Sequence, residues 1–331
     1  MVKSLEHVGL VAIGRNEGSN LRQCLQSVVG QLSNIVYVDS GSTDGSIELA
    51  ESLGATVVKL DISIPFTAAR ARNAGFEKLL ERDPLIEFVQ FVDGDCEIIE
   101  GWLEQALSTI SEHEAIAVVC GRRRERFPNA SMYNLLCDIE WNTPVGETKA
   151  CGGDALMRAS AFKAANGFNA ALIAGEEPEL CVRLRKSGWT IFRLDAEMTH
   201  HDAKMTHFGQ WWKRMVRAGH AYAEGSWLHG ASPERHWVKE SRSIWLWGFI
   251  VPAAALGLVP LTGGWSLLVL LIYPILTAKA CYSFYRQGTS LKHAALYGYF
   301  CILSKLPGVI GQFKFHINRL LSQQSTLIEY K

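Results

Sequence analysis

The sequence predicts an α/β domain with a doubly wound, mainly parallel sheet, followed by a hydrophobic helical hairpin. Short apolar runs alternate with helical segments through the first part of the chain, and polar clusters follow several of these runs directly. Strands that alternate with helices are typical of a parallel sheet with right-handed crossovers. Further on, residues 243–285 contain a single charge, Lys279. Such a long, nearly uncharged region is typical of helices that enter a membrane.

The expected elements of the α/β domain follow one another closely along the chain. Short apolar runs bounded by turn residues predict strands at 8–13, 35–38, 56–60, 88–92, 116–120 and 190–194. Apolar spacing predicts helices from Ser19 or Asn20 as N-cap, from about Ser46, and at 67–80, 102–111 and 208–222. A further helix is expected near Pro178, because proline fits the first helical position.

Charge balance and cysteine spacing exclude several classes of function. Lys+Arg and Asp+Glu both total 33, so no overall charge attracts nucleic acid. The eight cysteines form no Cys-x-x-Cys pair and no short His/Cys spacing, which argues against a zinc site and a disulfide framework and fits a reducing compartment. The run Val8–Ile13 is too short for a signal peptide, so we expect the N-terminal domain to stay in the cytosol. No Gly-x-Gly-x-x-Gly or P-loop pattern occurs, which counts against a dinucleotide cofactor and P-loop chemistry.

Polar residues follow three of the predicted strands. Arg15 and Glu17 come after the first strand, Asp39 after the second, and Asp93 and Asp95 after the strand that begins at Phe88. Ligands of open α/β sheets bind outside the carboxyl ends of the strands, so we expect these clusters to meet at one edge. Two carboxylates at this spacing suit a hard divalent cation, which can in turn hold a diphosphate. Asp-Gly-Asp is also ordinary turn chemistry.

Four motifs occur in an order that resembles glycosyltransferase family 2, whose members are inverting enzymes with the GT-A fold. They are V-A-I-G-R-N-E-G, V-D-S-G-S-T-D-G-S, A-R-N-A-G-F (71–76) and V-D-G-D. The resemblance covers roughly Val8 to Tyr222. It implies a nucleotide-diphosphate sugar as donor, with UDP favoured, and Mg²⁺ or Mn²⁺ as cofactor.

The same resemblance assigns roles to residues of the donor site. Asp39 would read the base, Asp93 would contact the ribose side and Asp95 would ligate the metal. Ile13-Gly14-Arg15 stands where the family usually has Pro-Thr-Tyr, which leaves the identity of the nucleotide open. The full set implied for the nucleotide-sugar site is Ile13, Arg15, Glu17, Asp39, Arg70, Asn73, Asp93, Gly94 and Asp95.

Glu176 and Glu177 form the second predicted chemical centre. Pro178 places Glu177 at the amino end of a helix, where a carboxylate is stabilised as the anion, so we expect it to be ionised and able to accept a proton. Such a residue can equally serve helix stability alone. The family holds Glu-Asp here and uses the Asp as catalytic base, which implies Glu177 as the base and Glu176 as the alternative. Glu179 and Arg183 are expected to pair on the outer face of the helix.

Other residues are implied for the acceptor and the metal. Cys151–Asp154 resembles the glycine-rich acceptor-side turn of the family, in which glycines let the backbone approach a sugar closely. Trp141 could stack on a sugar or belong to the core. Adjacent residues of an extended segment point in opposite directions, so only one histidine should complete the metal shell, and we favour His201 over His200. The acceptor-side residues are thus Gly152, Gly153, Asp154 and Trp141.

Two basic segments each allow two interpretations. Cys120–Pro128 carries four arginines, which indicate either a solvated loop or a grip on phosphate. Phe208–Tyr222 is expected to be a helix with tryptophans on one side and cations on the other. This pattern suits a helix in a membrane interface, and packing on the catalytic domain is the competing account.

Residues 243–331 are predicted to be a membrane-associated helical region. Ile244–Leu261 and Trp265–Tyr285 would form a hairpin that spans or re-enters the bilayer. The third apolar segment, Ala294–Gln312, contains Lys305, which is costly in mid-span, so we expect an in-plane or hairpin-packed helix and a basic cytosolic tail. Flanking cations put both ends of the hairpin on the cytosolic side of the inner membrane. They are Arg235, Lys239, Arg242, Arg286 and Lys292.

Together these patterns predict a catalytic domain at 1–230, a basic linker at 231–242 and the membrane region at 243–331. The predicted function is inverting transfer of a sugar from a nucleotide-diphosphate sugar to a hydroxyl of a lipid-linked or polysaccharide acceptor, such as an exopolysaccharide or lipopolysaccharide precursor. An alternative is transfer onto polyprenyl phosphate, as in relatives of dolichol-phosphate-mannose synthase, with the arginine run holding that phosphate. An alternative of another class is a non-catalytic membrane scaffold that retains the fold.

Overall fold

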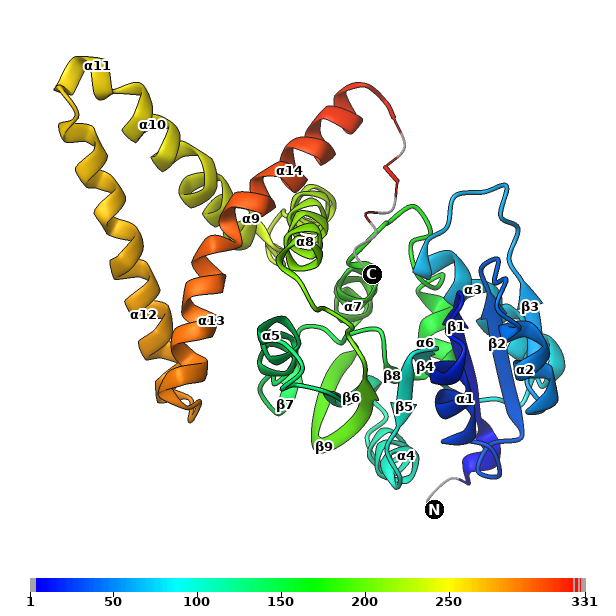
Figure 1. The fold of residues 1–331 in the computed structure, drawn as a ribbon. Helices are drawn as coiled ribbons and strands as arrows, with labels where there is room; N and C mark the ends of the chain where they lie inside the picture. Colours follow the sequence, from blue (N-terminus) through cyan, green and yellow to red (C-terminus); the bar gives the residue numbers. More distant parts are fainter. Residues whose placement is uncertain (1–3, 324, 327, 329–331) are drawn as a thin grey trace. The chain divides into compact units, whose positions relative to one another are not determined.

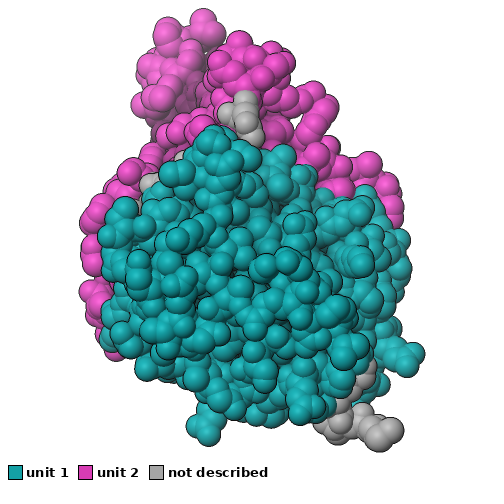
Figure 2. Space-filling model, turned by 90° about the vertical axis from the view of Figure 1, so that its right-hand side faces the viewer, with its two compact units in different colours: residues 1–128, 140–203 teal, residues 129–139, 204–331 magenta. Residues whose placement is uncertain are grey.

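The computed structural model describes residues 4–323, 325–326 and 328 (Figure 1). The chain divides into two compact units, coloured separately in Figure 2. Unit 1 comprises residues 1–128 and 140–203, and unit 2 comprises residues 129–139 and 204–331. The division into compact units places the helix at 208–229 with the C-terminal helices. A compact unit is not necessarily a functional domain, so the predicted domain boundary at residue 230 stays a prediction.

Unit 1 is built on a mixed sheet of nine strands, which confirms the predicted α/β class. The strand order is β3-β2-β1-β4-β8-β6-β9-β5, and β7 pairs with β9. The first four strands of this order are parallel, and β8 runs antiparallel between β4 and β6. The strands are β1 (Val8–Gly14), β2 (Asn34–Asp39), β3 (Thr56–Lys59), β4 (Phe88–Asp93), β5 (Cys96–Ile98), β6 (Ile116–Glu125), β7 (Gly146–Thr148), β8 (Ala155–Arg158) and β9 (Thr190–His201).

The helices of unit 1 start largely where the sequence predicts. The Thr67 hydroxyl accepts a hydrogen bond from the backbone N–H of Arg70 and so caps α3. The predicted side-chain cap of α1 is wrong, because Gly18 occupies that position with φ 50°, a conformation that suits glycine. The helices are α1 (Ser19–Gln26), α2 (Ser46–Ser52), α3 (Ala68–Arg82), α4 (Trp102–Glu112), α6 (Ala159–Ala164) and α7 (Glu176–Lys186).

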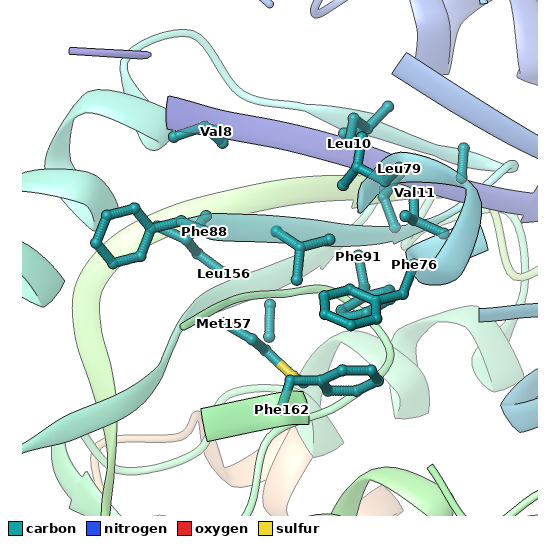
Figure 3. Packing of buried hydrophobic residues seen from close by; sticks show 14 of the residues in the cluster. Val8, Leu10, Val11, Phe76, Leu79, Phe88, Phe91, Leu156, Met157 and Phe162 are labelled. Atoms are coloured by element: carbon teal, nitrogen blue, oxygen red, sulfur yellow. The ribbon is translucent and has the colours of Figure 1, made fainter. Parts of the chain in front are cut away.

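The core of unit 1 fixes α3 against the sheet (Figure 3). Phe76 and Leu79 of α3 pack with apolar residues of β1, β4 and β8. A Cβ atom on Gly75 would lie 2.4 Å from Cγ1 of Val11, so the helix lies as close to β1 as a glycine allows. The Phe76 and Phe162 ring centroids are 4.6 Å apart in an edge-on arrangement. This packing fixes the helix that carries Arg72.

Within its described residues, unit 2 contains two helices that are long and apolar enough to cross a membrane, Trp265–Arg286 (22 residues) and Leu291–Leu320 (30 residues). The second of these consists of α13 and α14, which meet at Ser304, and α13 packs along α12. The in-plane or hairpin-packed orientation of the third apolar segment stays a prediction. The first predicted segment, Ile244–Leu261, is a series of short helical pieces. The helices of unit 2 are α5 (Met132–Glu140), α8 (Phe208–His229), α9 (Val238–Trp245), a π-helical segment (Leu246–Ile250), α10 (Val251–Gly257), α11 (Val259–Thr262), a 3-10 segment (Trp265–Leu271), α12 (Ile272–Arg286), α13 (Leu291–Leu303) and α14 (Lys305–Leu320). The last residue of α5, Glu140, is grouped with unit 1.

The aromatic side of α8 faces other helices of unit 2. Trp211 is 3% exposed and packs with Leu136 of α5 and Phe300 of α13. The ring centroids of Trp211 and Phe300 are 4.8 Å apart. Trp211 therefore lies in a small aromatic core within unit 2, and neither of the two sequence interpretations, a membrane interface or packing on the catalytic domain, predicts this contact.

Candidate active site

Two strands of unit 1 are longer than their apolar runs predict. The predicted arginine loop is strand as far as Glu125, because β6 pairs with β9 in parallel beyond the buried run. β9 in turn continues to His201. In this register Arg123 is the partner of Thr199, and Glu125 is the partner of His201. The extension brings an arginine and a histidine that are distant in sequence to the same edge of the sheet.

Arg72 joins the predicted catalytic carboxylate to the end of β4. Its guanidinium is buried, with 3% of the side chain exposed. Nη1 donates to Oε1 of Glu176 and to Oε1 of Glu177, both at 2.9 Å, and Nη2 donates to Oδ1 of Asp93 at 2.7 Å. Charge-assisted hydrogen bonds of this kind are short and strong and hold both groups in fixed geometry. The structure therefore brings Asp93, Glu176 and Glu177 together around one cation.

Arg123 makes a second bridge at the same strand end. Its Nε donates to Oδ2 of Asp154 at 2.9 Å, and its Nη2 lies 3.2 Å from Oδ2 of Asp93. The Thr199 hydroxyl and the backbone N–H of Asp93 also donate to the Asp154 carboxylate, at 2.7 and 3.1 Å. Asp154, predicted on the acceptor side, is 0% exposed. Its carboxylate orders the interior of the site.

The two carboxylates that share Arg72 have opposite pKa shifts. Burial raises the pKa of Asp93, but the charges of Arg72 and Arg123 outweigh it, and the pKa lies below its ordinary value. Burial, reinforced by the charge of Glu176, raises the pKa of Glu177 to about 7 against the opposing effect of Arg72. The position of Glu177 at a helix start predicts an ionised carboxylate. Burial opposes ionisation more strongly than the helix start favours it, so the pKa of Glu177 is raised. A carboxylate with a pKa near neutrality is suited to accept and release a proton.

Asp95 lies in a separate cluster beside His201. Oδ2 of Asp95 and Nε2 of His201 are 3.2 Å apart, and each residue is 6% exposed. The Cys96 thiol is 3.6 Å from Oδ1 of Asp95, and one ligand atom from each of the three residues lies within 4.8 Å of the others. Burial raises the pKa of Cys96 well above its ordinary value, so the sulfur stays a thiol at neutral pH. His200 precedes His201 in β9 and by strand alternation points to the other face of the sheet.

Trp141 lies over both clusters. Its ring is edge-on to the imidazole of His201, with centroids 5.0 Å apart, and the guanidinium of Arg123 is 5.6 Å from the indole centroid. The side chain is half-buried. The ring packs against His201 and Arg123 and is partly exposed, and its stacking on a sugar stays a prediction.

The glycine-rich turn before β8 lies directly against the Arg72 network. A Cβ atom on Gly153 would lie 2.6 Å from Nη2 of Arg72, 3.1 Å from Oδ2 of Asp93 and 3.2 Å from Oε1 of Glu177. A Cβ atom on Gly152 would meet nothing within 4 Å. Gly153 is therefore a position where only a missing side chain lets the backbone approach the carboxylates.

Residues predicted for the nucleotide lie at the ends of β1, β2 and β4. The backbone N–H of Gly94 donates to the Ile13 carbonyl at 2.7 Å and so ties the Asp-Gly-Asp turn to β1. Asp39 is 2% exposed, and its Oδ2 accepts from the backbone N–H groups of Gly41 and Ser42, both at 2.9 Å. Asp39 thus shapes the loop after β2 through its own hydrogen bonds.

The loops after β1 and β2 are also tied to each other. The backbone N–H of Asn16 donates to the Ser42 hydroxyl at 2.9 Å, and the N–H of Thr43 donates to Oδ1 of Asn16 at 2.7 Å. Arg15 is exposed and Glu17 is half-buried beside this junction. The convergence of the strand-end clusters, expected from the parallel order, is therefore present.

Two residues predicted for the donor site are engaged elsewhere. The Arg70 guanidinium donates to the backbone carbonyls of Ile64 and Pro65, at 2.6 and 2.9 Å, and holds the loop before α3. Asn73 pairs with the backbone of Phe168, donating to its carbonyl at 2.8 Å and accepting from its N–H at 2.9 Å. Both side chains fasten loops around the site, and the structure does not bring them to the carboxylates.

Sequence reasoning missed the two arginines that organise the site. Arg72 stands inside the third motif, and it occupies the buried side of α3 with Ala69, Phe76 and Leu79 at helical spacing. An arginine on an apolar helix face requires buried carboxylate partners, and this signal was available. The sequence signal for Arg123 is weaker, because Arg123 is one of four arginines in the same run and the other three have other partners in the structure.

The fold and the carboxylate-lined strand ends define a GT-A glycosyltransferase domain. Residues 11–163 match the family model described as glycosyl transferase family 2. Residues 11–163 therefore form a glycosyl transferase family 2 domain, and the protein is a glycosyltransferase.

Relatives and solved structures agree with this assignment. The glycosyltransferase AglE of Haloferax volcanii is 25% identical over 232 residues, which are 66% of this chain and 74% of that protein. The succinoglycan biosynthesis protein ExoA of Rhizobium meliloti is 28% identical over 192 residues, 54% of this chain and 58% of that protein. Among solved structures, the mannosyltransferase PcManGT from Pyrobaculum calidifontis, in complex with GDP-Man and Mn²⁺, superimposes with a TM-score of 0.62 at 16% identity over 93% of this chain and 87% of that one. The last likeness shows the GT-A fold.

Proposed function

We propose that the protein transfers a sugar, with inversion, from a nucleotide-diphosphate sugar to a hydroxyl of a lipid-linked or membrane-proximal glycan. The observation that carries the proposal is the Arg72 bridge, which places Glu177 and the β4 aspartate Asp93 in one buried site. A donor bound across the strand ends would thus have a carboxylate of near-neutral pKa beside it.

The cluster of Asp95 and His201 fits a divalent cation. A carboxylate oxygen and an imidazole nitrogen, both buried, lie 3.2 Å apart and form a donor set that suits Mn²⁺. Mg²⁺ prefers oxygen ligands and would rely mainly on the carboxylate. The sulfur of Cys96 lies beside the same two residues as a third potential ligand. A cation bound by these residues supplies positive charge next to the diphosphate of the leaving nucleotide. PcManGT, which has the same fold, is described with Mn²⁺ and GDP-Man.

Glu177 accepts the proton of the acceptor hydroxyl. Arg72 fixes the Glu177 carboxylate, and the backbone of Gly153 lies so close that a Cβ atom there would be 3.2 Å from Oε1 of Glu177. The hydroxyl oxygen attacks the anomeric carbon from the face opposite the nucleotide, and the bond to the diphosphate breaks in the same displacement. General-base help of this kind typically contributes about 10²–10⁴-fold.

The apolar helices of unit 2 support a membrane-proximal acceptor. Trp265–Arg286 has no buried residue in its most apolar window, so most of its apolar side chains are exposed or only half-buried. Attachment to the cytosolic face of the inner membrane would bring the enzyme to lipid-linked glycans. The relative ExoA is named for succinoglycan biosynthesis, which supports a cell-envelope polysaccharide as the product. UDP is favoured as the carrier by the motif resemblance.

Turnover with defined donors tests the proposal. The purified protein is incubated with UDP- and GDP-sugars, Mn²⁺ or Mg²⁺ and a lipid extract, and the released nucleoside diphosphate is measured. We expect release that requires both metal and lipid extract, and a product whose anomeric configuration, read by NMR, is opposite to that of the donor. Retention of configuration would contradict the inverting mechanism, and absence of metal-dependent release with every donor would favour the scaffold alternative.

The polyprenyl-phosphate alternative is less well supported because the arginine run has internal partners. Arg123 is bound to two carboxylates, Arg124 pairs with Glu197, and Arg126 pairs with Glu97 at 2.8 Å. An acceptor that is already a phosphate needs no strong base. Glu177→Gln therefore separates the two reactions, since near-total loss of transfer indicates a hydroxyl acceptor and mild loss indicates a phosphate.

A further inference from the structure

A pocket of about 490 Å³ lies on α9 in unit 2, outside every residue assigned to glycosyl transfer. This volume falls in the range of ligand-binding pockets. Three of its lining residues are cations, and most of the others are apolar. The cations and apolar residues that line the pocket are Arg235, Val238, Lys239, Arg242, Leu246 and Trp247.

The packing of α9 determines which side chains reach the pocket. Ser241 exchanges hydrogen bonds with Gln312 of α14, at 3.0 and 3.1 Å. Ile244 is buried against Gly308, and a Cβ atom on Gly248 would lie 2.3 Å from the Lys305 carbonyl oxygen. These three α9-side positions share one helical face, which is therefore held against α14. Residues 239, 242 and 246 follow the opposite face at spacings of three and four, and Arg235 lies in the turn before α9.

The cations that line the pocket are not neutralised. Arg235, Lys239 and Arg242 are exposed, and within the described part of the chain none of them has an ion pair with a carboxylate. No acidic residue lines the pocket in the same described ranges. Three cations around one concave surface repel one another, so the surface is complementary to an anion with several oxygen acceptors.

The surroundings of the pocket are apolar, which indicates a lipid. Val238, Leu246 and Trp247 line the same pocket as the cations. α9 continues through the π-helical segment Leu246–Ile250 to α10 and α11, and Figure 1 shows this arm continuing into α12. Leu256 and Leu261 on the arm are 64% and 83% exposed, which is typical of a surface covered by acyl chains. A tryptophan beside cations at the start of apolar helices is the arrangement found at the headgroup level of a bilayer.

We propose that this pocket binds the phosphate headgroup of an anionic lipid, with Lys239 and Arg242 holding the phosphate and Arg235 at its rim. Leu246 and Trp247 contact the start of the lipid chain. The site anchors unit 2 at a specific depth and selects anionic over zwitterionic lipid. It requires membrane attachment of the protein, but it does not require the proposed glycosyl transfer.

Lipid binding in detergent tests the pocket. The full chain, purified in a non-ionic detergent, is titrated with fluorescent phosphatidic acid or with phosphatidylcholine of the same chain length. Lys239→Gln with Arg242→Gln removes two pocket cations. The matched control, Arg286→Gln with Lys292→Gln, removes two exposed cations at the α12–α13 turn and the same net charge. Circular dichroism checks that both variants are folded.

We expect the wild-type protein to prefer phosphatidic acid and the pocket variant to bind it about 25-fold more weakly, since each cation near an anionic lipid contributes roughly fivefold. The control variant should stay within about twofold of wild type, and inorganic phosphate should not displace the lipid. The proposed lipid site would be contradicted by equal losses in both variants, by displacement with inorganic phosphate, or by equal affinity for the two lipids. Failure to bind either lipid would overturn membrane attachment as well. Donor turnover is measured separately, so the result for lipid binding does not decide the glycosyl-transfer proposal.

Discussion

The two aspartates at the end of β4 are one residue apart and lie in different chemical surroundings. Asp93 is held between the buried guanidinium of Arg72 and the half-buried guanidinium of Arg123, which keep its pKa low. Asp95 lies against an imidazole and a thiol. The first arrangement fixes charges in position, and the second offers a carboxylate and a nitrogen as ligands. Under the proposed mechanism, one short turn would therefore serve two purposes, positioning the Glu177 carboxylate on the Asp93 side and binding a cation on the Asp95 side.

The largest expected effect is on the Asp93 side, at Glu177. Glu177→Gln keeps the shape of the side chain and its acceptor oxygen for Arg72 but removes the base. We expect kcat for sugar transfer to fall by about 10²–10⁴-fold with little change in donor affinity. Glu176→Gln is the matched control, because Glu176 bonds to the same nitrogen of Arg72. A greater loss in the Glu176 variant would make Glu176 the base.

Arg72→Lys should have the next largest effect. A lysine ammonium cannot reproduce the planar fork that reaches Glu177, Glu176 and Asp93 together, so buried carboxylates are left partly unpaired. We expect a loss of about 2–3 kcal/mol in the free energy of unfolding, which is about one charged hydrogen bond. Chemical denaturation measures it. Arg70→Lys, two residues earlier on α3, is the control, because Arg70 is half-buried and its hydrogen bonds in the described part of the chain go only to backbone carbonyls of the preceding loop. Equal losses in the two variants would contradict the positioning role of Arg72.

On the Asp95 side, His201→Asn should weaken binding of Mn²⁺ by about 10–100-fold, as loss of a group in or next to a metal shell typically does. The measurement is titration followed by electron paramagnetic resonance of free Mn²⁺. His200→Asn, the adjacent residue on the other face of β9, should leave the affinity unchanged. If the His200 variant loses more, the pairing of Asp95 with His201 does not describe the metal site.

The smallest expected effect is at the glycine turn. Gly153→Ala places a methyl group 2.6 Å from a buried nitrogen of Arg72 and should cost about 1–3 kcal/mol of stability with a lower kcat. Gly152→Ala meets nothing within 4 Å and should behave as wild type. Thermal unfolding and steady-state kinetics compare the two. Indistinguishable variants would show that the turn does not press on the Arg72 network.

The part of the site that rests on buried apolar strands could be predicted from the sequence. The run at Phe88–Val92 predicts β4, and parallel order predicts that Asp39, Asp93 and Asp95 meet at one edge. The part made by polar strand extensions could not, because the ends of β6 and β9 carry charged residues and have no apolar pattern. Register shifts within their pairing then decide which arginine and which histidine face the site. The ionisation of Glu177 also depends on burial, which local sequence does not reveal.

The most direct test of the account is the pH dependence of kcat for sugar transfer. The pKa of Glu177 is raised to about 7, and the base acts as a carboxylate, so the rate should be constant above neutrality and fall about tenfold per pH unit below it. The Glu177→Gln variant should show a low rate without this inflection. A wild-type rate that stays constant down to pH 5, with the same profile in the variant, would contradict Glu177 as the base that Arg72 holds.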